Sequence, residues 1–249
     1  MISKNQLKFY ASLKDRKVRA ESGLFMTEGH KIIQEGLRSG CPCQMVLARE
    51  GFFGHNEETD RLLSTQHVEM VGEQEFRKLA GTENPQGVLG VFDFRNLLIS
   101  KLSAENAIVL FDLADPRNMG TIIRSADWFG FHELVIGETC VDIFNDKVLR
   151  STMGSIFHSR FLQSADLAAD LAAIRTEYRI VTADLGGTDY RSRKRNGKSA
   201  FVFSNEARGP SPAILELTDE IVTIPGGGQA ESLNVSCAAA VIMAGIGKT

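Results

Sequence analysis

Five polar residues in three separate loops have side chains of the types that bind and orient a ligand. They are Asn118, Arg124, Glu206, Ser232 and Asn234. The loops follow apolar stretches that predict β-strands beginning at Ala107, Ala200 and Glu220. Ligands of parallel α/β sheets bind beyond the carboxyl ends of the strands. The sequence therefore predicts that the five side chains lie at the ends of neighbouring strands and share one site.

Four of these residues have ordinary structural interpretations as well. Asn118 suits the N-cap of the helix that follows it, and Ser232 or Asn234 suits the N-cap of the last helix. Glu206 lies in a turn that ends at Gly209, and a turn carboxylate is usually only solvated. For each residue taken alone both interpretations stay open, and the functional one depends on their occurring together.

The predicted helix from 119 to 129 has an apolar face and a second, unusual face. At 100° per residue the apolar face gathers Ile122, Ile123, Ala126 and Phe129. Arg124 lies nearly opposite, beside Thr121 and Trp128. A surface arginine is one interpretation of this position. The neighbouring tryptophan instead favours an interface or a substrate surface.

The glycine-rich segment "IPGGGQAESLNVSCAAAVIMAG", residues 224 to 245, fails the tests for familiar phosphate loops. A dinucleotide fingerprint from Gly226 needs glycine at position 231, where Glu231 stands. The Gly-Lys-Ser at 197–199 and the Gly-Lys-Thr at 247–249 both lack the upstream glycine of a P-loop. A nucleotide-dependent oxidoreductase is therefore disfavoured.

The sequence contains no pattern typical of a metal site, a membrane-spanning segment or a secretory signal. The 4 cysteines form no C-x-x-C pair, and the 5 histidines show no ligand spacing with them or with one another. No apolar run of about 18 residues would span a bilayer, and the N-terminus lacks the apolar core of a secretory signal. We expect a cytoplasmic protein that binds no metal and no membrane.

The pattern of helices and strands changes partway along the 249 residues. Residues 1–95 mix helix and strand signals and predict a small α/β domain. Residues 96–106 connect it to residues 107–249, where near-continuous apolar strands alternate with helices. That alternation predicts a parallel sheet with helices on both faces.

Two basic runs stand out against a net charge of −3. Residues 1–19 hold Lys4, Lys8, Lys14, Arg16, Lys17 and Arg19 against Asp15 alone, and residues 190–198 hold five basic residues and no acid. Such runs are often solvated charge. Two of them on one chain favour a phosphate-rich partner.

Three stretches together resemble the SpoU (TrmH) family of RNA ribose 2′-O-methyltransferases. They are "DPRNMGTIIRSADWFG", "NEARG" with its preceding strand, and "IPGGGQAESLNVSCAAAV", in the family's order and spacing. The stretches "FMTEGHKIIQEGL" and "NPQGVLGVF" resemble the accessory domain of the ribosomal-RNA members. That domain is similar to the L30e and L7Ae type of RNA-binding ribosomal protein.

The resemblance implies an α/β fold whose C-terminal segment forms a trefoil knot. It implies that S-adenosylmethionine binds between the loops that follow two strands, with the glycines at 226–228 letting the backbone pass close to it. The cofactor-binding residues it assigns are Ser204, Glu206, Gly209, Ile224 and Leu233. This sequence departs from the family at three positions. Ser204 stands where glycine is usual, Gly226 where a bulky residue is usual, and Thr152 where serine is usual.

The resemblance also assigns catalytic roles. Arg124 stands beside the target ribose and its phosphate, and since an arginine is a poor base it fixes the phosphate and polarises the hydroxyl. Asn118, Ser232 and Asn234 orient the ribose and the arginine, and Glu206 anchors the loop or the arginine. Trp128 and the small residues of the last helix predict a homodimer through the knotted domain.

Alternative functions stay open on the sequence alone. The accessory domain favours 23S ribosomal RNA as the substrate, because transfer-RNA members of the family commonly lack that domain. A transfer-RNA 2′-O-methyltransferase and a non-catalytic RNA-binding protein of the same fold are the alternatives.

Overall fold

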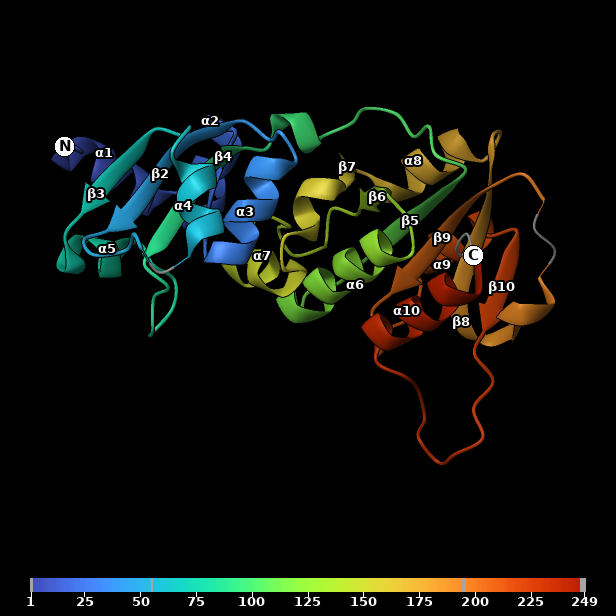
Figure 1. Cartoon of the computed structure of the whole chain (residues 1–249). Helices are drawn as coiled ribbons and strands as arrows, with labels where there is room; N and C mark the ends of the chain where they lie inside the picture. The colour runs from blue at the N-terminus through green and yellow to red at the C-terminus, as the bar shows by residue number, and fades with distance from the viewer. Residues whose placement is uncertain (1, 55, 194–195, 247–249) are drawn as a thin grey trace. The chain divides into compact units, whose positions relative to one another are not determined.

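The computed structural model describes residues 2–54, 56–193 and 196–246 and divides into two compact units (Figure 1). The first unit comprises Met1–Leu97 and Asp142–His158, and the second comprises Leu98–Val141 and Ser159–Thr249. In the described residues no helix is long and apolar enough to cross a membrane.

The first unit is built on a four-stranded mixed sheet with the strand order β1-β4-β2-β3. The β1–β4 and β2–β4 pairs are antiparallel, and the β2–β3 pair is parallel. Its strands are β1 (Leu24–Glu28), β2 (Cys43–Arg49), β3 (Val68–Val71) and β4 (Val88–Asp93). Its helices are α1 (Lys4–Ser12), α2 (Arg16–Ser22), α3 (His30–Arg38), α4 (Glu57–Leu63), α5 (Glu73–Leu79) and the 3₁₀ turn η1 (Arg95–Leu97).

A segment from the middle of the chain completes the first unit. It contains α7 (Asp146–Thr152) and the 3₁₀ turn η2 (Ser155–His158). The Phe25 ring of β1 stacks on Phe144 at 5.2 Å between centroids and lies 5.7 Å from Phe157. Arg19, 5% exposed, pairs with Asp142. Since aromatic packing and a buried ion pair both involve it, this segment is part of the first unit's core.

The second unit is a six-stranded sheet with the order β10-β8-β9-β5-β6-β7, in which every pair is parallel. Its strands are β5 (Asn106–Phe111), β6 (Glu133–Ile136), β7 (Arg160–Gln163), β8 (Tyr178–Asp189), β9 (Lys198–Ser204) and β10 (Glu220–Thr223). The central strands are buried along most of their length, which explains their near-continuous Val, Ile and Phe content.

Two pairs of helices cover the two faces of this sheet. Helix α6 (Pro116–Trp128) contacts α10 (Val235–Ile246), and α8 (Leu167–Ile174) contacts α9 (Pro212–Leu217). Figure 1 shows α6 and α10 in front of the sheet and α8 behind it. The 3₁₀ turn η3 (Tyr190–Ser192) follows β8. The predicted parallel α/β fold is therefore confirmed for the second unit.

Within the protein, a close approach of backbone to a glycine occurs in β8 and not at the glycines of residues 226–228. A Cβ added at any of these three would meet no atom within 4 Å, and their loop is exposed. At Gly187 in β8, a Cβ would lie 2.6 Å from the carbonyl carbon of Val222 in β10. Gly187 thus allows β8 to continue alongside β10 after a register shift between Ile221 and Val222.

The segment predicted as a connection, residues 96–106, is held firmly in place. Leu102 is 2% exposed, and the Glu133 carboxylate accepts hydrogen bonds from the backbone N–H groups of Ser103 (2.7 Å) and Ala104 (2.9 Å). Tyr178 donates its hydroxyl hydrogen bond to the Ala104 carbonyl at 2.5 Å. These contacts make the connection part of the second unit's structure.

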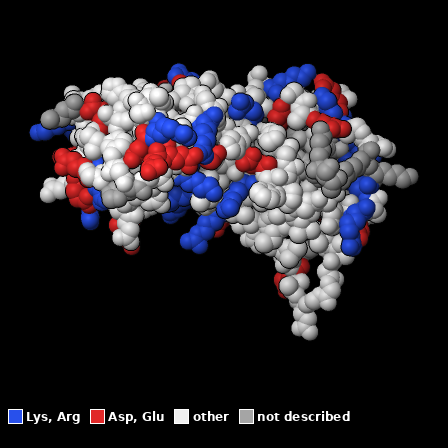
Figure 2. Space-filling view, in the orientation of Figure 1, with Lys and Arg blue, Asp and Glu red and all other residues white. Residues whose placement is uncertain are grey.

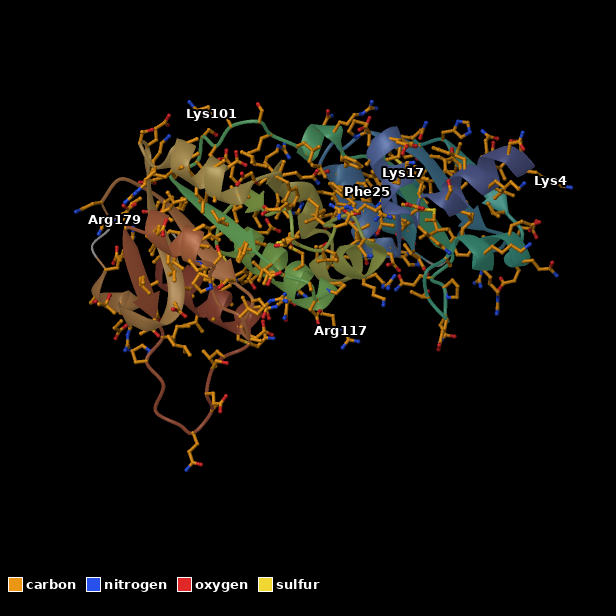
Figure 3. All side chains as sticks on the ribbon, turned by 180° about the vertical axis from the view of Figure 1, so that it is seen from behind. Lys4, Lys17, Phe25, Lys101, Arg117 and Arg179 are labelled. Atoms are coloured by element: carbon orange, nitrogen blue, oxygen red, sulfur yellow. The ribbon has the colours of Figure 1, made fainter. Side chains whose placement is uncertain are left out.

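The two basic runs divide into exposed and internally paired residues. Lys4 and Lys17 point away from their helices in Figure 3, where Phe25 lies inside the unit. Arg19 is buried in its ion pair, so this residue of the first run is unavailable to a phosphate. Figure 2 shows basic and acidic side chains interspersed, with no single continuous basic face in that view.

In the second run the described cations have partners within the chain. Arg191 pairs with Asp189 at 2.6 Å, and the Arg193 guanidinium lies 5.0 Å from the centre of the Phe201 ring. Lys198 lies 3.6 Å from a Glu177 oxygen. The remaining cations of this run, residues 194–195, lie outside the described residues. The described cations of this run therefore contribute to contacts within the fold.

Candidate active site

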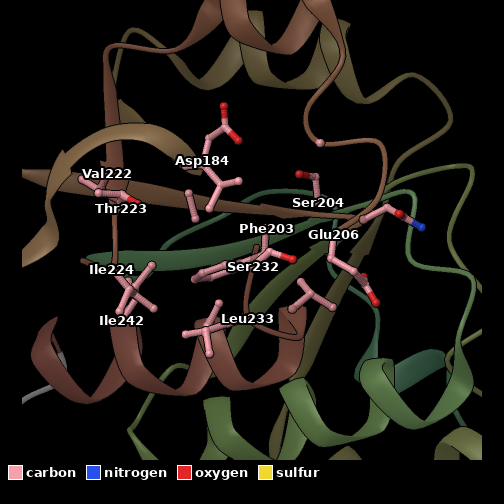
Figure 4. A pocket seen from close by; sticks show the side chains of 16 residues that line it. Asp184, Phe203, Ser204, Glu206, Val222, Thr223, Ile224, Ser232, Leu233 and Ile242 are labelled. Carbon is pink, nitrogen blue, oxygen red and sulfur yellow. The ribbon is translucent and has the colours of Figure 1, made fainter. Parts of the chain in front are cut away.

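A pocket opens in the second unit beside the middle of β8 and at the ends of β9 and β10, next to the start of α10 (Figure 4). All the residues predicted to bind the cofactor line it: Ser204, Glu206, Gly209, Ile224 and Leu233. Ser232, predicted to be catalytic, lines it as well. The structure thus brings the loop after β9 and the loop after β10 together around one cavity.

The pocket combines apolar walls with a few polar groups. Ile224, Leu233 and Ile242 lie together on the side of α10, and Phe203 lies behind them (Figure 4). The polar lining includes the hydroxyl of Ser204, 8% exposed, and the carboxylates of Asp184 and Glu206. Pockets of this composition suit a small organic ligand with one apolar part and several hydrogen-bonding groups.

Asn118 and Asn234, predicted from separate motifs, contact each other. The Asn234 side-chain amide donates to Asn118 Oδ1 at 3.0 Å. Asn234 Oδ1 accepts from the backbone N–H of Ser236 at 2.8 Å, so Asn234 rather than Ser232 caps α10. One side chain therefore fixes the start of α10 and ties it to the first turn of α6.

The N-cap of α6 is Asp115, which corrects the sequence-based assignment to Asn118. Asp115 Oδ1 accepts from the backbone N–H groups of Arg117 at 2.6 Å and Asn118 at 3.3 Å. Pro116 occupies the first helical position, where its missing N–H costs no helical hydrogen bond. Asn118 is consequently released from capping, and its side chain is available for the contact with Asn234.

Arg124 lies on the exposed side of α6, as the helical wheel predicts. Ile122, Ile123 and Ala126 are fully buried, whereas Trp128 is 84% exposed. Arg124, Asn118 and Asn234 are not among the residues that line the pocket. The structure places Asn234 between the lining residues Leu233 and Val235, so the α6–α10 contact adjoins the pocket.

Three residues that the sequence analysis did not select connect two loops of the site. Arg208 pairs with the Asp112 carboxylate at 2.6 Å, and the Asn205 side-chain amide donates to the Asp112 carbonyl at 3.4 Å. Asn205 Oδ1 also accepts from the backbone of Ala207 at 2.9 Å. Asp112 has a left-handed φ of 58°, which is uncommon outside glycine. The loop after β5 and the loop after β9 are therefore joined.

Cys140 is a buried thiol with a structural hydrogen bond. Burial raises the pKa of Cys140, whose Sγ donates to the Leu110 carbonyl at 3.2 Å. In the described parts of the chain, no group of three or more His, Cys, Asp or Glu side chains could hold a metal ion. The polar side chains that line the pocket are hydroxyls, the Asn205 amide and the carboxylates of Asp184 and Glu206.

Comparisons with known proteins agree with both units. Residues 105–244 match the SpoU rRNA Methylase family, and residues 4–90 match the MRM3-like substrate binding domain. The 23S rRNA (guanosine(2553)-2′-O)-methyltransferase RlmP of Bacillus subtilis is 32% identical over 245 residues, which cover 97% of this chain and 96% of that protein.

Solved structures agree with the fold over nearly the whole chain. A protein of the TrmH family from Porphyromonas gingivalis has a TM-score of 0.87 and 28% identity, covering 98% of each chain. The SpoU methyltransferase AviRb of Streptomyces viridochromogenes, solved in complex with the cofactor AdoMet, has a TM-score of 0.84 at 24% identity and covers 98% of this chain and 97% of its own. With the family match spanning most of the second unit and a relative aligned along the whole length, this chain belongs to the SpoU rRNA methylase family.

Proposed function

We propose that this protein transfers a methyl group from S-adenosylmethionine to a ribose 2′-hydroxyl of ribosomal RNA. The observation that carries the proposal is the single pocket that gathers the family's cofactor loops, bordered by the Asn118–Asn234 contact. Family membership supports the same reaction class.

The residues of the pocket fit the cofactor. Ile224, Leu233 and Ile242 offer an apolar surface for a flat adenine ring, and Ser204 and Glu206 offer hydrogen-bonding groups for ribose hydroxyls or an amino group. S-adenosylmethionine supplies an activated methyl group that already carries its leaving group. The protein's task is then to position the acceptor and to stabilise charge.

Arg124 has the central role toward the RNA in this proposal. A guanidinium is protonated throughout the physiological pH range, so Arg124 is not the base. Its five N–H donors bind a phosphate and polarise the attacking hydroxyl. Asn118, Ser232 and Asn234 orient the ribose, and Glu206 holds the loop after β9.

Replacement of Arg124 tests this scheme. Arg124→Ala is expected to lower the single-turnover methylation rate of unmodified 23S rRNA by about 10²–10³-fold, because a preorganised charge is lost. Calorimetry should show S-adenosylmethionine binding within about twofold of wild type, since Arg124 does not line the pocket. Arg124→Lys keeps the charge but lacks the planar guanidinium, so its methylation rate should lie between those of wild type and Arg124→Ala. Full methylation by Arg124→Ala would refute the scheme.

Ribosomal RNA is favoured over transfer RNA by the first unit. Residues 4–90 match a substrate binding domain, and the relative RlmP is named for methylation of 23S rRNA. Mapping 2′-O-methyl groups in RNA from cells with and without the gene would identify the nucleotide. Methylation lost from transfer RNA alone would favour that alternative, and failure to bind S-adenosylmethionine would favour a non-catalytic RNA-binding protein.

We further propose that the protein acts in the cytoplasm as a homodimer with a C-terminal trefoil knot. Trp128 supports the dimer, because its large apolar side chain is 84% exposed on a helix whose other face is already buried. Part of the close-packing surface expected on α10 is used within the chain. Ala239 is fully buried, and Gly245 packs against the Tyr190 ring. The interface therefore depends mainly on α6.

A further inference from the structure

Helix α6 presents a stripe of exposed side chains along its outer side. The stripe contains Arg117, Thr121, Arg124 and Trp128, all of which are exposed. Arg117 and Arg124 are seven residues apart in the sequence. At about 100° per residue this spacing separates them by only about 20° around the helix, two turns apart. One face of α6 therefore carries two guanidinium groups.

Neither guanidinium has a partner in the described part of the chain. Arg117 donates a hydrogen bond to Asp115 only through its backbone N–H, and the Arg124 side chain forms no hydrogen bond or ion pair there. Figure 3 shows Arg117 extending away from α6. Elsewhere in the second unit, Arg175 and Arg208 pair with carboxylates at 2.7 and 2.6 Å. The two arginines of α6 are therefore available to an external anion.

The position of Arg117 is unfavourable for the helix itself. Arg117 follows Pro116 in the first turn of α6, where the backbone N–H groups carry partial positive charge. A cation there is destabilising, and acidic residues are preferred. The Asp115 carboxylate is engaged in capping two backbone N–H groups. Helix stability therefore does not explain this arginine, whereas an anion bound by its side chain would offset the unfavourable charge.

The charge of the stripe favours a phosphate backbone over a second copy of the chain. A symmetric dimer brings the same surface patch of both copies together. If the whole stripe formed the interface, the cations of one copy would lie near those of the other, and like charges oppose association. The stripe contains no acidic residue to pair with them. A guanidinium fork matches the oxygens of a phosphate, and Trp128 at the far end keeps its role in the proposed dimer.

We infer that Arg117 binds a phosphate of the substrate RNA, a short distance along the strand from the phosphate that Arg124 binds. Seven residues of helix rise about 10 Å, so one strand running along α6 can meet both guanidiniums. Asn118, next in the chain, contacts Asn234 beside the pocket. Arg117 thus contributes RNA affinity close to the site of methyl transfer. The inference rests on the proposed function, because it takes the methylation substrate as the ligand.

RNA affinity and its salt dependence test the inference. The probe is an unmodified 23S rRNA transcript, with affinity measured by filter binding at several salt concentrations. Arg117→Ala should bind the transcript about threefold to tenfold more weakly at fixed salt, and the slope of log affinity against log salt should fall by about 0.7–0.9, the loss of one phosphate contact. Arg117→Lys keeps the charge and should keep the wild-type slope.

Methylation kinetics distinguish the role of Arg117 from that of Arg124. In single turnovers, Arg117→Ala should need about threefold to tenfold more RNA for half of its maximal rate, while the rate at saturating RNA stays within about twofold of wild type. Arg124→Ala is expected instead to lose rate at saturating RNA. Because Arg117 does not line the pocket, S-adenosylmethionine affinity in calorimetry should match that of wild type.

A charge-matched variant and a stability measurement serve as controls. Arg160 is exposed in the same unit, and its side chain donates to the Ser159 carbonyl at 3.3 Å. Arg160→Ala removes one positive charge away from the stripe, so its RNA affinity should stay within about twofold of wild type. Arg117→Ala should be at least as stable as wild type in thermal unfolding, because an unfavourable cation leaves the first turn of α6.

Phosphate ethylation locates the contact directly. Ethylation removes the charge of a phosphate, so transcripts ethylated at the phosphate that Arg117 binds should be depleted from wild-type complexes. The same transcripts should be recovered in complexes with Arg117→Ala, because the contact is already absent there.

Several outcomes would overturn the inference. An unchanged salt slope for Arg117→Ala, or an equal loss of affinity in Arg160→Ala, would show that Arg117 makes no particular phosphate contact, and identical ethylation patterns would show the same. A monomeric Arg117→Ala beside a dimeric wild type in sedimentation would assign the side chain to the subunit interface. If the wild-type protein itself neither binds nor methylates the transcript, the proposed function fails instead, and the two failures are distinguishable.

Discussion

Asp112 is the residue that most directly joins the two parts of the candidate active site. Its carboxylate pairs with Arg208 and its carbonyl accepts from Asn205, so the loop that leads to Asn118 and the loop that carries Glu206 move together. Its left-handed φ of 58° is tolerated by Asp and Asn better than by most residues. Positioning therefore depends on a residue outside the five predicted to be catalytic.

Replacing Asp112 by Asn should show the effect of the carboxylate charge separately from the effect of the left-handed backbone conformation. The backbone can keep its left-handed φ, while the ion pair with Arg208 is lost. Since Arg208 is 65% exposed, we expect a change in unfolding free energy of less than about 1 kcal/mol. Affinity for S-adenosylmethionine should fall about threefold to tenfold in calorimetry, because the loop after β9 is held less firmly.

Arg208→Ala provides the matched control for Asp112→Asn. If the ion pair is responsible, the two single variants and the double variant should have similar cofactor affinity. Additive losses would show instead that Arg208 contacts the cofactor by itself.

At the scale of single residues the sequence predicted the pocket better than it predicted the contacts around it. Ser204, Ile224 and Leu233 followed from recognisable motifs placed after strands, and all three line the pocket. The N-cap was misplaced at Asn118 because two capping residues compete there, although Pro116 indicates that Asp115 should cap the helix. The Asp112 contacts join residues about ninety positions apart, which no local pattern reveals.

Among the elements, β6 has a buried carboxylate that holds the connecting segment. Burial alone would raise the pKa of Glu133, but hydrogen bonds from the Ala104 and Ser103 backbones and the Ser103 hydroxyl favour the ionised form, and the net pKa is lowered. A lowered folded-state pKa contributes stability that is present above the unfolded pKa and is lost as pH falls through the folded pKa.

Glu133→Gln should therefore destabilise the protein in a pH-dependent way. At pH 7 the loss is expected to be about 1–3 kcal/mol, the range for hydrogen bonds to a charged group. The difference from wild type should shrink as pH falls below about 4.3, the pKa of an unperturbed Glu, and should disappear once pH is below the lowered pKa of Glu133 in the folded protein. Urea unfolding at several pH values measures this difference in unfolding free energy. A difference that stays constant with pH would show that the charge is not responsible.

The elements that the sequence predicted are those with long, strongly apolar patterns. β5, β6 and β9 are buried on both faces and were found, whereas β7, with only four residues and a half-exposed pattern, was missed. In β8 the apolar pattern "RIVTAD" ends at Asp184, but the strand continues to Asp189 because β10 pairs with the extension. Tertiary pairing of this kind extends a strand beyond its local signal.

The exposed Trp128 predicts that the whole molecule forms a homodimer. Trp128→Asp should convert a dimer at micromolar concentration into a monomer with little methyltransferase activity, because burial of a charge opposes the interface. Trp128→Phe keeps an apolar ring and should remain dimeric. Sedimentation velocity measures the oligomeric state of each variant, and a parallel methylation assay measures its activity. A monomeric wild-type protein, or an active monomer of the aspartate variant, would contradict the proposed dimer.

The inclusion of residues 142–158 in the first unit has a consequence for the order of folding during synthesis. When Leu97 leaves the ribosome, Arg19 still lacks Asp142, and the Phe25 ring still lacks Phe144 and Phe157. A buried cation without its partner costs roughly 3–5 kcal/mol. The partners follow only after about sixty further residues, roughly three to twelve seconds at bacterial rates of about 5–20 residues per second. The nascent N-terminal unit therefore waits, incompletely packed and open to chaperones and proteases, while β5, α6 and β6 of the second unit are being made.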